Sequence, residues 1–325
     1  MTLQTVKVGA MAARKHVEPA KFTDPDFTIK AQPRAKVPFD RYDTVWFNTG
    51  TLCNIECVNC YIDSSPKNDQ LVYLTRTEVL KFLQEAAAFS DKPTEIGFTG
   101  GEPFMNPDLL AMLEDTLSRG FRALVLTNAM RPMLRFKEKL LALGGRYPKR
   151  LSFRVSLDHF EREGHEAIRG ARTWERALEG LVWLGENGFD VSVAARKART
   201  VDEPEARRGY DRLFSELGLR IDANDPSRLV LFPEMAHDDD VVEISEGCWD
   251  ILGMKPQQVM CASSRMVLKR KGSDAPTVVA CTLIPYSSAF EVGATLEEAR
   301  STVTLNHRHC SRFCVLGKAS CRVDG

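Results

Sequence analysis

Six β-like runs alternate with amphipathic helical stretches between residues 44 and 232, and this alternation limits the possible folds most strongly. Apolar strands are predicted at 44–49, 95–99, 122–127, 151–157, 191–194 and 228–232. Helices are predicted at 75–89, 108–117, 133–143, 173–186 and 203–217. Repeated strand–helix–strand units form right-handed crossovers around a parallel sheet. We therefore predict an α/β fold, a partial (β/α)6 TIM-like barrel two units short of the eight-stranded form.

The chain has 325 residues, enough for this barrel and a smaller second unit. Residues 1–41 contain several prolines and no sustained period, so we predict an irregular leader that follows the surface. This leader is too short and irregular for a separate domain of ordinary size. A run of acidic residues at 238–240 marks the next boundary. The barrel is therefore predicted at 42–237, and a small α+β domain at 238–325.

Composition excludes several classes of partner. The 44 basic and 44 acidic side chains cancel, so no basic excess indicates nucleic acid. The first fifteen residues resemble neither a secretory signal nor a membrane span. We predict a cytoplasmic protein with no nucleic-acid or membrane partner. In that reducing compartment, the nine cysteines favour metal ligands or buried thiols over disulfides.

Three cysteines lie within eight residues directly after the first predicted strand: Cys53, Cys57 and Cys60. Functional loops of parallel α/β sheets follow the carboxyl ends of strands, so this is a place where chemistry is expected. Structural zinc needs four protein ligands, whereas a [4Fe–4S] cluster held by three thiolates leaves one iron open. A zinc loop with a distant fourth ligand and three buried thiols are the alternatives.

The spacing Cys53-x3-Cys57-x2-Cys60 resembles the signature of the radical S-adenosylmethionine (radical SAM) superfamily. A Gly-Gly-Glu-Pro sequence after the second strand resembles the loop that binds the methionine amino group in that family. Glycines allow a backbone to approach a ligand closely, and a carboxylate accepts hydrogen bonds from an ammonium. Ser-Leu-Asp after the fourth strand, followed by His-x2-Ile-Arg-Gly, resembles relatives that carry an extra cluster domain. The resemblance assigns cofactor contacts to Tyr61, Gly100, Gly101, Glu102, Pro103, Asn128, Ser156, Asp158 and Arg169.

Six further cysteines lie between residues 248 and 321. Their pattern resembles a variant of the SPASM or twitch cluster-binding domains, although its spacing departs from theirs and its cysteines are too few for two clusters. The resemblance implies one auxiliary [4Fe–4S] cluster, and Cys248 is left as a buried thiol or a spare ligand. A four-thiolate zinc ribbon is the alternative. The ligands are expected among Cys261, Cys281, Cys310, Cys314 and Cys321.

The resemblance implies reductive cleavage of S-adenosylmethionine at the catalytic cluster on Cys53, Cys57 and Cys60. The resulting 5′-deoxyadenosyl radical would abstract hydrogen from a small molecule or a short peptide. A flavodoxin- or ferredoxin-type protein is the expected electron donor, and the auxiliary cluster is expected to assist electron transfer. The competing hypothesis is a non-catalytic iron–sulfur or zinc scaffold that binds a protein partner.

Overall fold

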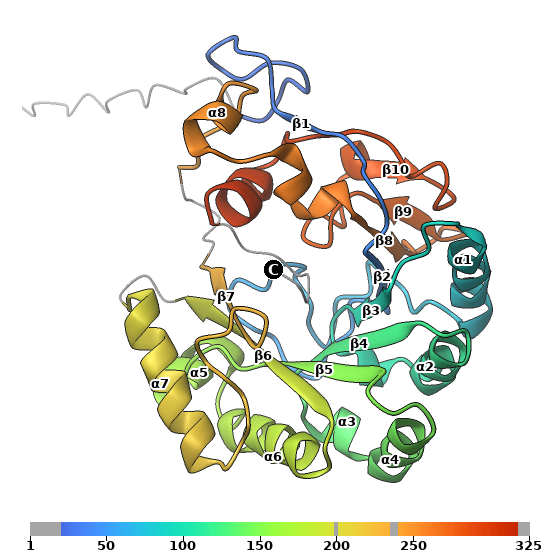
Figure 1. Cartoon of the computed structure of the whole chain (residues 1–325), viewed down its shortest axis with the longest axis vertical. Helices are drawn as coiled ribbons and strands as arrows, with labels where there is room; N and C mark the ends of the chain where they lie inside the picture. The colour runs from blue at the N-terminus through green and yellow to red at the C-terminus, as the bar shows by residue number, and fades with distance from the viewer. Residues whose placement is uncertain (1–20, 198–200, 235–239, 318–325) are drawn as a thin grey trace, which may run out of the picture.

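The computed structural model describes residues 21–197, 201–234 and 240–317, and its centre is a nine-stranded sheet (Figure 1). The strand order is β10-β9-β8-β2-β3-β4-β5-β6-β7. The seven strands from β8 to β7 are parallel, and β9 and β10 join them antiparallel. The strands are β2 (Thr44–Asn48), β3 (Glu95–Thr99), β4 (Arg122–Thr127), β5 (Leu151–Ser156), β6 (Asp190–Lys197), β7 (Leu229–Pro233), β8 (Ser264–Leu268), β9 (Thr277–Val279) and β10 (Glu291–Gly293).

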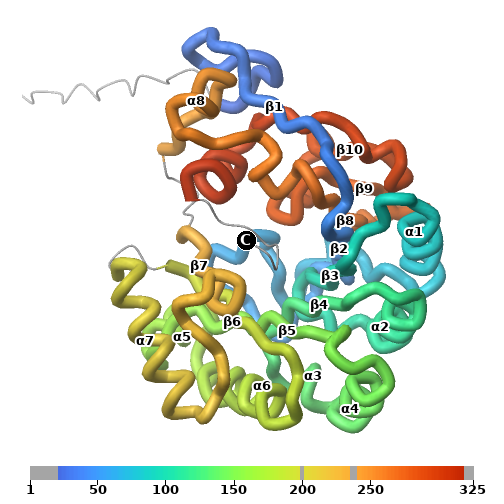
Figure 2. The backbone as a smooth tube through the Cα atoms, in the orientation of Figure 1, coloured from blue at the N-terminus to red at the C-terminus, as the bar shows by residue number. Residues whose placement is uncertain are grey.

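The α/β prediction is confirmed, because the six predicted strands occur in order as β2 to β7. In the described residues β7 and β10 are the two edges of the sheet and do not pair, so the barrel stays open. Helices cover its outer face, as the tube in Figure 2 also shows. They are α1 (Arg76–Ala88), α2 (Leu109–Ser118), α3 (Arg131–Leu134), α4 (Lys137–Arg146), α5 (Arg162–Arg169), α6 (Trp174–Glu186) and α7 (Glu203–Glu216). The short helix α8 (Cys248–Leu252) lies instead in the C-terminal segment, beside the blue N-terminal segment in Figure 1.

Local sequence explains where these helices begin and break. Thr75 caps α1 in a capping box, in which Glu78 returns a hydrogen bond to the Thr75 backbone. The single helix predicted at 133–143 is wrong, because the chain forms α3 and α4 instead. Phe136 separates them with φ −109° and ψ 16°, outside helical values. No helix in the described part of the chain is long and apolar enough to cross a membrane.

Side chains of the sheet alternate between two apolar layers. Val45 and Phe47 of β2 face the helices, whereas Trp46 faces the interior of the open barrel. Gly97, the partner of Trp46 on β3, leaves room for that indole, since a Cβ there would lie 2.3 Å from its ring. The interior layer continues without a break into the C-terminal segment through Met266 of β8.

The C-terminal segment extends the barrel sheet. Strand β8 pairs with β2 in parallel, with Thr44 opposite Ser264. The described part of the predicted leader also packs here, because β1 (Lys36–Val37) pairs antiparallel with β11 (Val303–Thr304). Figure 1 shows this blue segment beside the orange and red C-terminal elements. Short 3₁₀ turns occur at Pro103–Met105, Pro256–Gln258, Met260–Ala262 and Ser288–Phe290, and a π-helix spans Cys310–Val315.

Candidate functional site

A cavity lies at the carboxyl ends of strands β3 to β7, beside the loop that follows β2. Ten of the residues predicted from the sequence line it, although they come from five separate segments of the chain. Glu102 and Pro103 lie behind its wall, where both are buried. The ten are Cys53, Cys57, Cys60, Tyr61, Gly100, Gly101, Asn128, Ser156, Asp158 and Arg169.

The cysteine loop is held in its shape by its own backbone and by two neighbouring elements. Asn59 and Asp63 adopt left-handed conformations with φ of 51° and 50°, which tighten the turns around Cys60. The Val58 N–H donates to the Ile168 carbonyl of α5 at 2.8 Å. Arg196 of β6 donates to the Val58 carbonyl. The loop is therefore anchored on the side of the barrel that carries α5 and β6.

The two glycines after β3 allow the backbone of this loop to pass close by. A Cβ on Gly101 would lie 2.2 Å from the Leu52 carbonyl oxygen. A Cβ on Gly100 would lie 2.5 Å from the Gly50 carbonyl oxygen. Gly100 also has φ +138°, which L side chains rarely adopt. The Gly101 N–H donates to the Gly50 carbonyl at 2.8 Å. These glycines therefore set the position of Cys53 within the protein itself.

Glu102 fastens the end of β3 to the end of β4. Its carboxylate accepts from the Thr127 hydroxyl at 2.8 Å, the Asn128 N–H at 2.9 Å and the Phe104 N–H at 3.2 Å. Burial raises the pKa of Glu102 to about 6, although these hydrogen bonds oppose the rise. The amide of Asn128 in turn donates to Asn54 Oδ1 inside the cysteine loop at 2.8 Å. Asn54 was not among the site residues predicted from the sequence, in which its one signal is its position beside Cys53.

Asp158 and two arginines form a buried charge group on the opposite wall. Arg169 Nε lies 2.7 Å from Asp158 Oδ2, and Arg196 Nε lies 3.6 Å from Oδ1. Burial alone would raise the pKa of Asp158, but the two arginines outweigh it and hold that pKa below its usual value. The same ion pair raises the pKa of Arg169 despite its burial. Two cations therefore share one carboxylate, which leaves positive charge at the wall.

Tyr61 joins the cysteine loop to the far side of the cavity. Its hydroxyl donates to the Pro233 carbonyl at 3.0 Å, and Arg196 lies 5.3 Å above its ring. The ring also makes edge contacts with Phe232 of β7 and Phe313 of the π-helix. Neither phenylalanine was among the predicted site residues, because their contact with Tyr61 depends on strand order that spacing does not reveal.

The three thiols of the loop suit a metal cluster better than a buried apolar role. Burial, then Glu102, raises the pKa of Cys53 to about 12, and burial also raises that of Cys57. Thiolates at this place therefore need bound cations to form. Ser64 also lines the cavity, and its buried hydroxyl has no hydrogen-bond partner in the described structure. Three sulfurs around a cavity with an unsatisfied polar atom fit a [4Fe–4S] cluster with an open iron.

A second set of thiols lies in the interior apolar layer formed by the C-terminal segment. Burial raises the pKa of the Cys310 thiol well above its usual value, and the nearby thiols of Cys281 and Cys261 raise it further. Cys310 and Cys314 lie one turn apart in the π-helix and are also buried. Cys248 on α8 is half-buried and contacts Ser245 at 3.5 Å. Cys321 lies outside the described residues.

Within the described ranges, no three His, Cys, Asp or Glu side chains lie at the spacing of ligands to a single metal ion. A zinc ribbon would need four ligands at about 2.0–2.3 Å from one ion. His309 Nδ1 lies 3.0 Å from the Leu283 carbonyl, and the His309 N–H donates to His307 Nδ1. Both histidines are therefore engaged locally.

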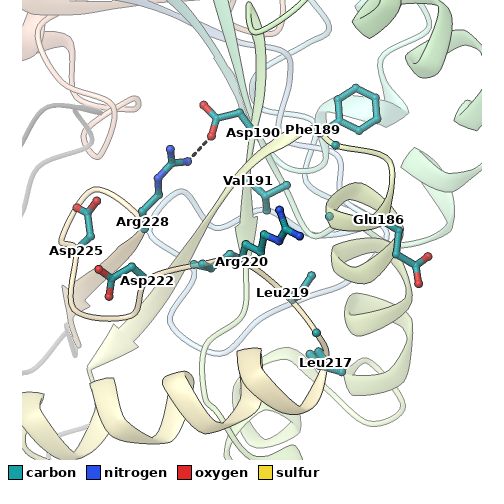
Figure 3. Close-up of a pocket in the computed structure, with 14 residues that line it drawn as sticks. Glu186, Phe189, Asp190, Val191, Leu217, Leu219, Arg220, Asp222, Asp225 and Arg228 are labelled. Carbon is teal, nitrogen blue, oxygen red and sulfur yellow. Dashed lines mark hydrogen bonds and ion pairs between the residues drawn. The ribbon is translucent and has the colours of Figure 1, made fainter.

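A larger cavity of about 600 Å³ lies at the other end of the barrel (Figure 3). It is lined by the start of β6 and by the chain that follows α7, with Arg228 paired to Asp190. No predicted site residue lines it. Because parallel α/β folds place their chemistry at the carboxyl ends of strands, the smaller cavity at the cysteine loop is the candidate site.

Comparison with known proteins agrees with this location. The family model for the radical SAM superfamily matches residues 47–196, which contain the cysteine loop, Gly100 to Pro103, Asp158 and Arg169. A curated relative, Fe-coproporphyrin III synthase of Methanosarcina barkeri, is 32% identical over 155 residues. That match covers 47% of this chain and 37% of the relative, so this chain spans little more than a third of it.

Two solved structures share the fold at low sequence identity. The structure of anSMEcpe with bound AdoMet has a TM-score of 0.55 and 13% identity, and the alignment covers 79% of each chain. Streptococcus suis SuiB bound to its precursor peptide SuiA has a TM-score of 0.54 and 12% identity. That alignment covers 78% of this chain and 62% of SuiB. Both alignments extend beyond the residues that the family model matches.

Proposed function

The chain belongs to the radical SAM superfamily, and from this premise we propose that it is an enzyme that cleaves S-adenosylmethionine reductively at a [4Fe–4S] cluster on Cys53, Cys57 and Cys60. With these groups bound, one electron enters the sulfonium and a carbon–sulfur bond breaks, giving methionine and a 5′-deoxyadenosyl radical that abstracts hydrogen from substrate. The observation that carries the proposal is the convergence of the three thiols with seven other predicted cofactor contacts on one cavity.

Different residues around the cavity would bind different parts of the cofactor. Gly100 and Gly101 present backbone beside the thiols, where a methionine amino group can be received. Arg169 and Arg196 share the single carboxylate of Asp158, so their positive charge can attract a cofactor carboxylate. Ser156 at the end of β5 is placed to contact a ribose. Glu102 acts as a positioning residue here, since its oxygens already accept bonds from β4 and its own turn.

The apolar part of the cavity wall would exclude water from the place where the radical forms. Leu126, Ala194 and Phe232 line the cavity from β4, β6 and β7 and contribute no polar side chain. Tyr61 closes the side next to Cys60 by its contacts with Phe232 and Phe313. An apolar wall next to a charged cofactor site directs the reactive carbon toward substrate and away from solvent.

We further propose that the C-terminal thiols hold an auxiliary [4Fe–4S] cluster that assists electron transfer, with ligands among Cys261, Cys281, Cys310, Cys314 and Cys321. Burial of the four described thiols in one apolar layer supports this, and so does the proximity of Cys281 and Cys261 to Cys310, on which their charges act. The substrate is proposed to be a small molecule or a short peptide, and the electron donor a flavodoxin- or ferredoxin-type protein. The protein is proposed to act in the cytoplasm.

The test is release of 5′-deoxyadenosine under anaerobic conditions. Protein reconstituted with iron and sulfide is mixed with dithionite and S-adenosylmethionine, and the nucleoside is measured by chromatography. We expect release from the parent and from Cys248→Ala, whose thiol lies outside the cavity. Cys57→Ala should release none. A parent with full iron content that releases no nucleoside would favour the scaffold hypothesis instead.

A further inference from the structure

Arg265 is a buried cation without a carboxylate partner among the described residues. It lies on β8, its side chain is 1% exposed, and no ion pair includes it. The guanidinium donates to the carbonyls of Cys261, Ser264, Ala299 and Ser301. Phe39 covers one face at 4.8 Å. These contacts satisfy its hydrogen-bonding groups but leave its charge uncompensated.

An uncompensated buried charge is costly, and a cation of this kind normally lies next to an anion. Arg34, which is also fully buried, follows that pattern, since it pairs with Glu243 at 2.7 Å. The titratable groups whose charges act on Arg265 are Cys261, Tyr42 and Cys281. The Tyr42 hydroxyl donates to the Leu296 carbonyl, and burial raises its pKa, so it stays neutral. Arg265 Nη1 also donates to the Cys261 carbonyl at 2.5 Å, so this cation lies directly beside one of the proposed cluster ligands.

We propose that Arg265 is the counter-ion of the auxiliary cluster, a positioning residue that sets its reduction potential and does not ligate it. This rests on the auxiliary cluster of the proposed function. A cluster held by four thiolates is negatively charged, and reduction adds one more negative charge. A nearby fixed cation stabilises the reduced form more than the oxidised form and so raises the potential.

The hydrogen bonds of the Arg265 guanidinium support this role as much as its charge does. Arg265 holds the carbonyl of Cys261 directly, and the same guanidinium holds Ala299 and Ser301, which precede β11. A neutral residue of equal length would lose both the charge and the carbonyl bonds. Lysine keeps the charge but cannot reproduce the fork of donors. The two replacements therefore separate an electrostatic role from a structural one.

The experiment uses the variant that lacks Cys53, Cys57 and Cys60, so that iron is held by the C-terminal thiols alone. Midpoint potentials are measured by electron paramagnetic resonance in poised samples. For Arg265→Met we expect the ratio of reduced to oxidised cluster at a fixed potential to fall at least tenfold, a shift of about 59 mV for one electron. Arg265→Lys should change the ratio of reduced to oxidised cluster by less than about threefold, which corresponds to a shift in midpoint potential of less than about half of 59 mV.

Arg270→Met is the matched control. Arg270 lies just beyond the same strand, but its charge is paired with Glu291 at 2.6 Å, so its loss should leave the potential unchanged. An unshifted potential in Arg265→Met overturns the inference. If Arg265→Met binds no iron while Arg265→Lys does, and the two apoproteins unfold at the same urea concentration, the need for charge is supported. Loss of iron in both overturns it, because the carbonyl bonds would then be the essential feature.

Failure of the auxiliary cluster itself gives a different result. If the parent of this series takes up no iron, both the inference and the auxiliary cluster are overturned. Release of 5′-deoxyadenosine by the unmodified chain, measured separately, still reports on the loop of Cys53, Cys57 and Cys60. The two parts of the proposed function are therefore tested independently.

Discussion

Replacing Gly101 by alanine tests whether the glycine pair sets the position of the cysteine loop. The new Cβ would lie 2.2 Å from the Leu52 oxygen, 2.5 Å from the Leu52 carbonyl carbon and 2.7 Å from the Thr51 oxygen. All three atoms are backbone, so no side chain can rotate away, and the chain immediately before Cys53 must move. The expected consequence is lower stability together with poorer iron uptake at the loop.

The magnitude follows from two contributions. Overpacking a filled site costs about 1–3 kcal/mol, and a backbone clash belongs at the upper end. Separating the two segments also weakens the 2.8 Å hydrogen bond from the Gly101 N–H to the Gly50 carbonyl, worth about 1 kcal/mol. We therefore predict a loss of about 4 kcal/mol in the free energy of unfolding, or a urea midpoint about 2 M lower at an ordinary slope.

Urea unfolding of the apoprotein followed by circular dichroism measures this loss, and iron content after reconstitution measures the effect on the loop. Gly145→Ala is the control, because it lies in α4 with nothing within 4 Å of the new Cβ. Alanine there should add about 0.8–1 kcal/mol of stability through helix propensity. A Gly101→Ala protein within about 1 kcal/mol of the parent, less than the overpacking cost, and with full iron uptake would refute the reasoning.

Three further predictions concern charge and capping. Arg169→Ala removes the 2.7 Å hydrogen bond to Asp158 and leaves that carboxylate paired with Arg196 at 3.6 Å, so we predict a loss of about 1.5–3 kcal/mol in urea unfolding; an unchanged midpoint would mean that Arg196 compensates fully. The folded-state pKa of Glu102, about 6, lies above its ordinary value of 4.5. The protonated carboxyl group therefore stabilises the fold fully below pH 4.5, and this stabilisation is lost as the pH rises through 6. The loss amounts to about 2 kcal/mol in the free energy of unfolding. When the free energy of unfolding is measured from pH 4 to 8, Glu102→Gln should remove this decrease. Thr75→Ala removes the cap of α1 and should cost about 1 kcal/mol in urea unfolding, whereas no change would show that the capping box contributes nothing.

The sequence predicted the barrel strands well because each is a short apolar run bounded by turn residues. It failed at residues 133–143, where the apolar period continues through Phe136 although the backbone leaves the helix there. It also could not reveal that β8 pairs with β2, because strand partners separated by more than 200 residues leave no periodic signal. The relation of the C-terminal segment to the barrel therefore required the structure.

The features of the candidate site were likewise predicted from the sequence only in part. Ser156 and Asp158 were predicted from the family resemblance, and the fold rule adds that residues at strand ends meet at one edge. Spacing could not show that Arg196 shares Asp158 with Arg169. The resemblance assigned Glu102 to the ligand, and spacing could not show that its oxygens also bind the end of β4. Side-chain direction, which depends on tertiary packing, accounts for these differences.

The pairing of β8 with β2 also determines how the two groups of thiols are related. Cys261 precedes β8 by three residues, and Cys53 follows the opposite end of its parallel partner β2. The π-helix connects these two regions, because Phe313 lies between Cys310 and Cys314 in the chain and packs against Tyr61, the neighbour of Cys60. Under the proposed function, a change in ligation at Cys310 or Cys314 would therefore move a side chain that packs against the cavity of the cysteine loop. The C-terminal thiols would then influence the first site through packing, in addition to the proposed electron transfer.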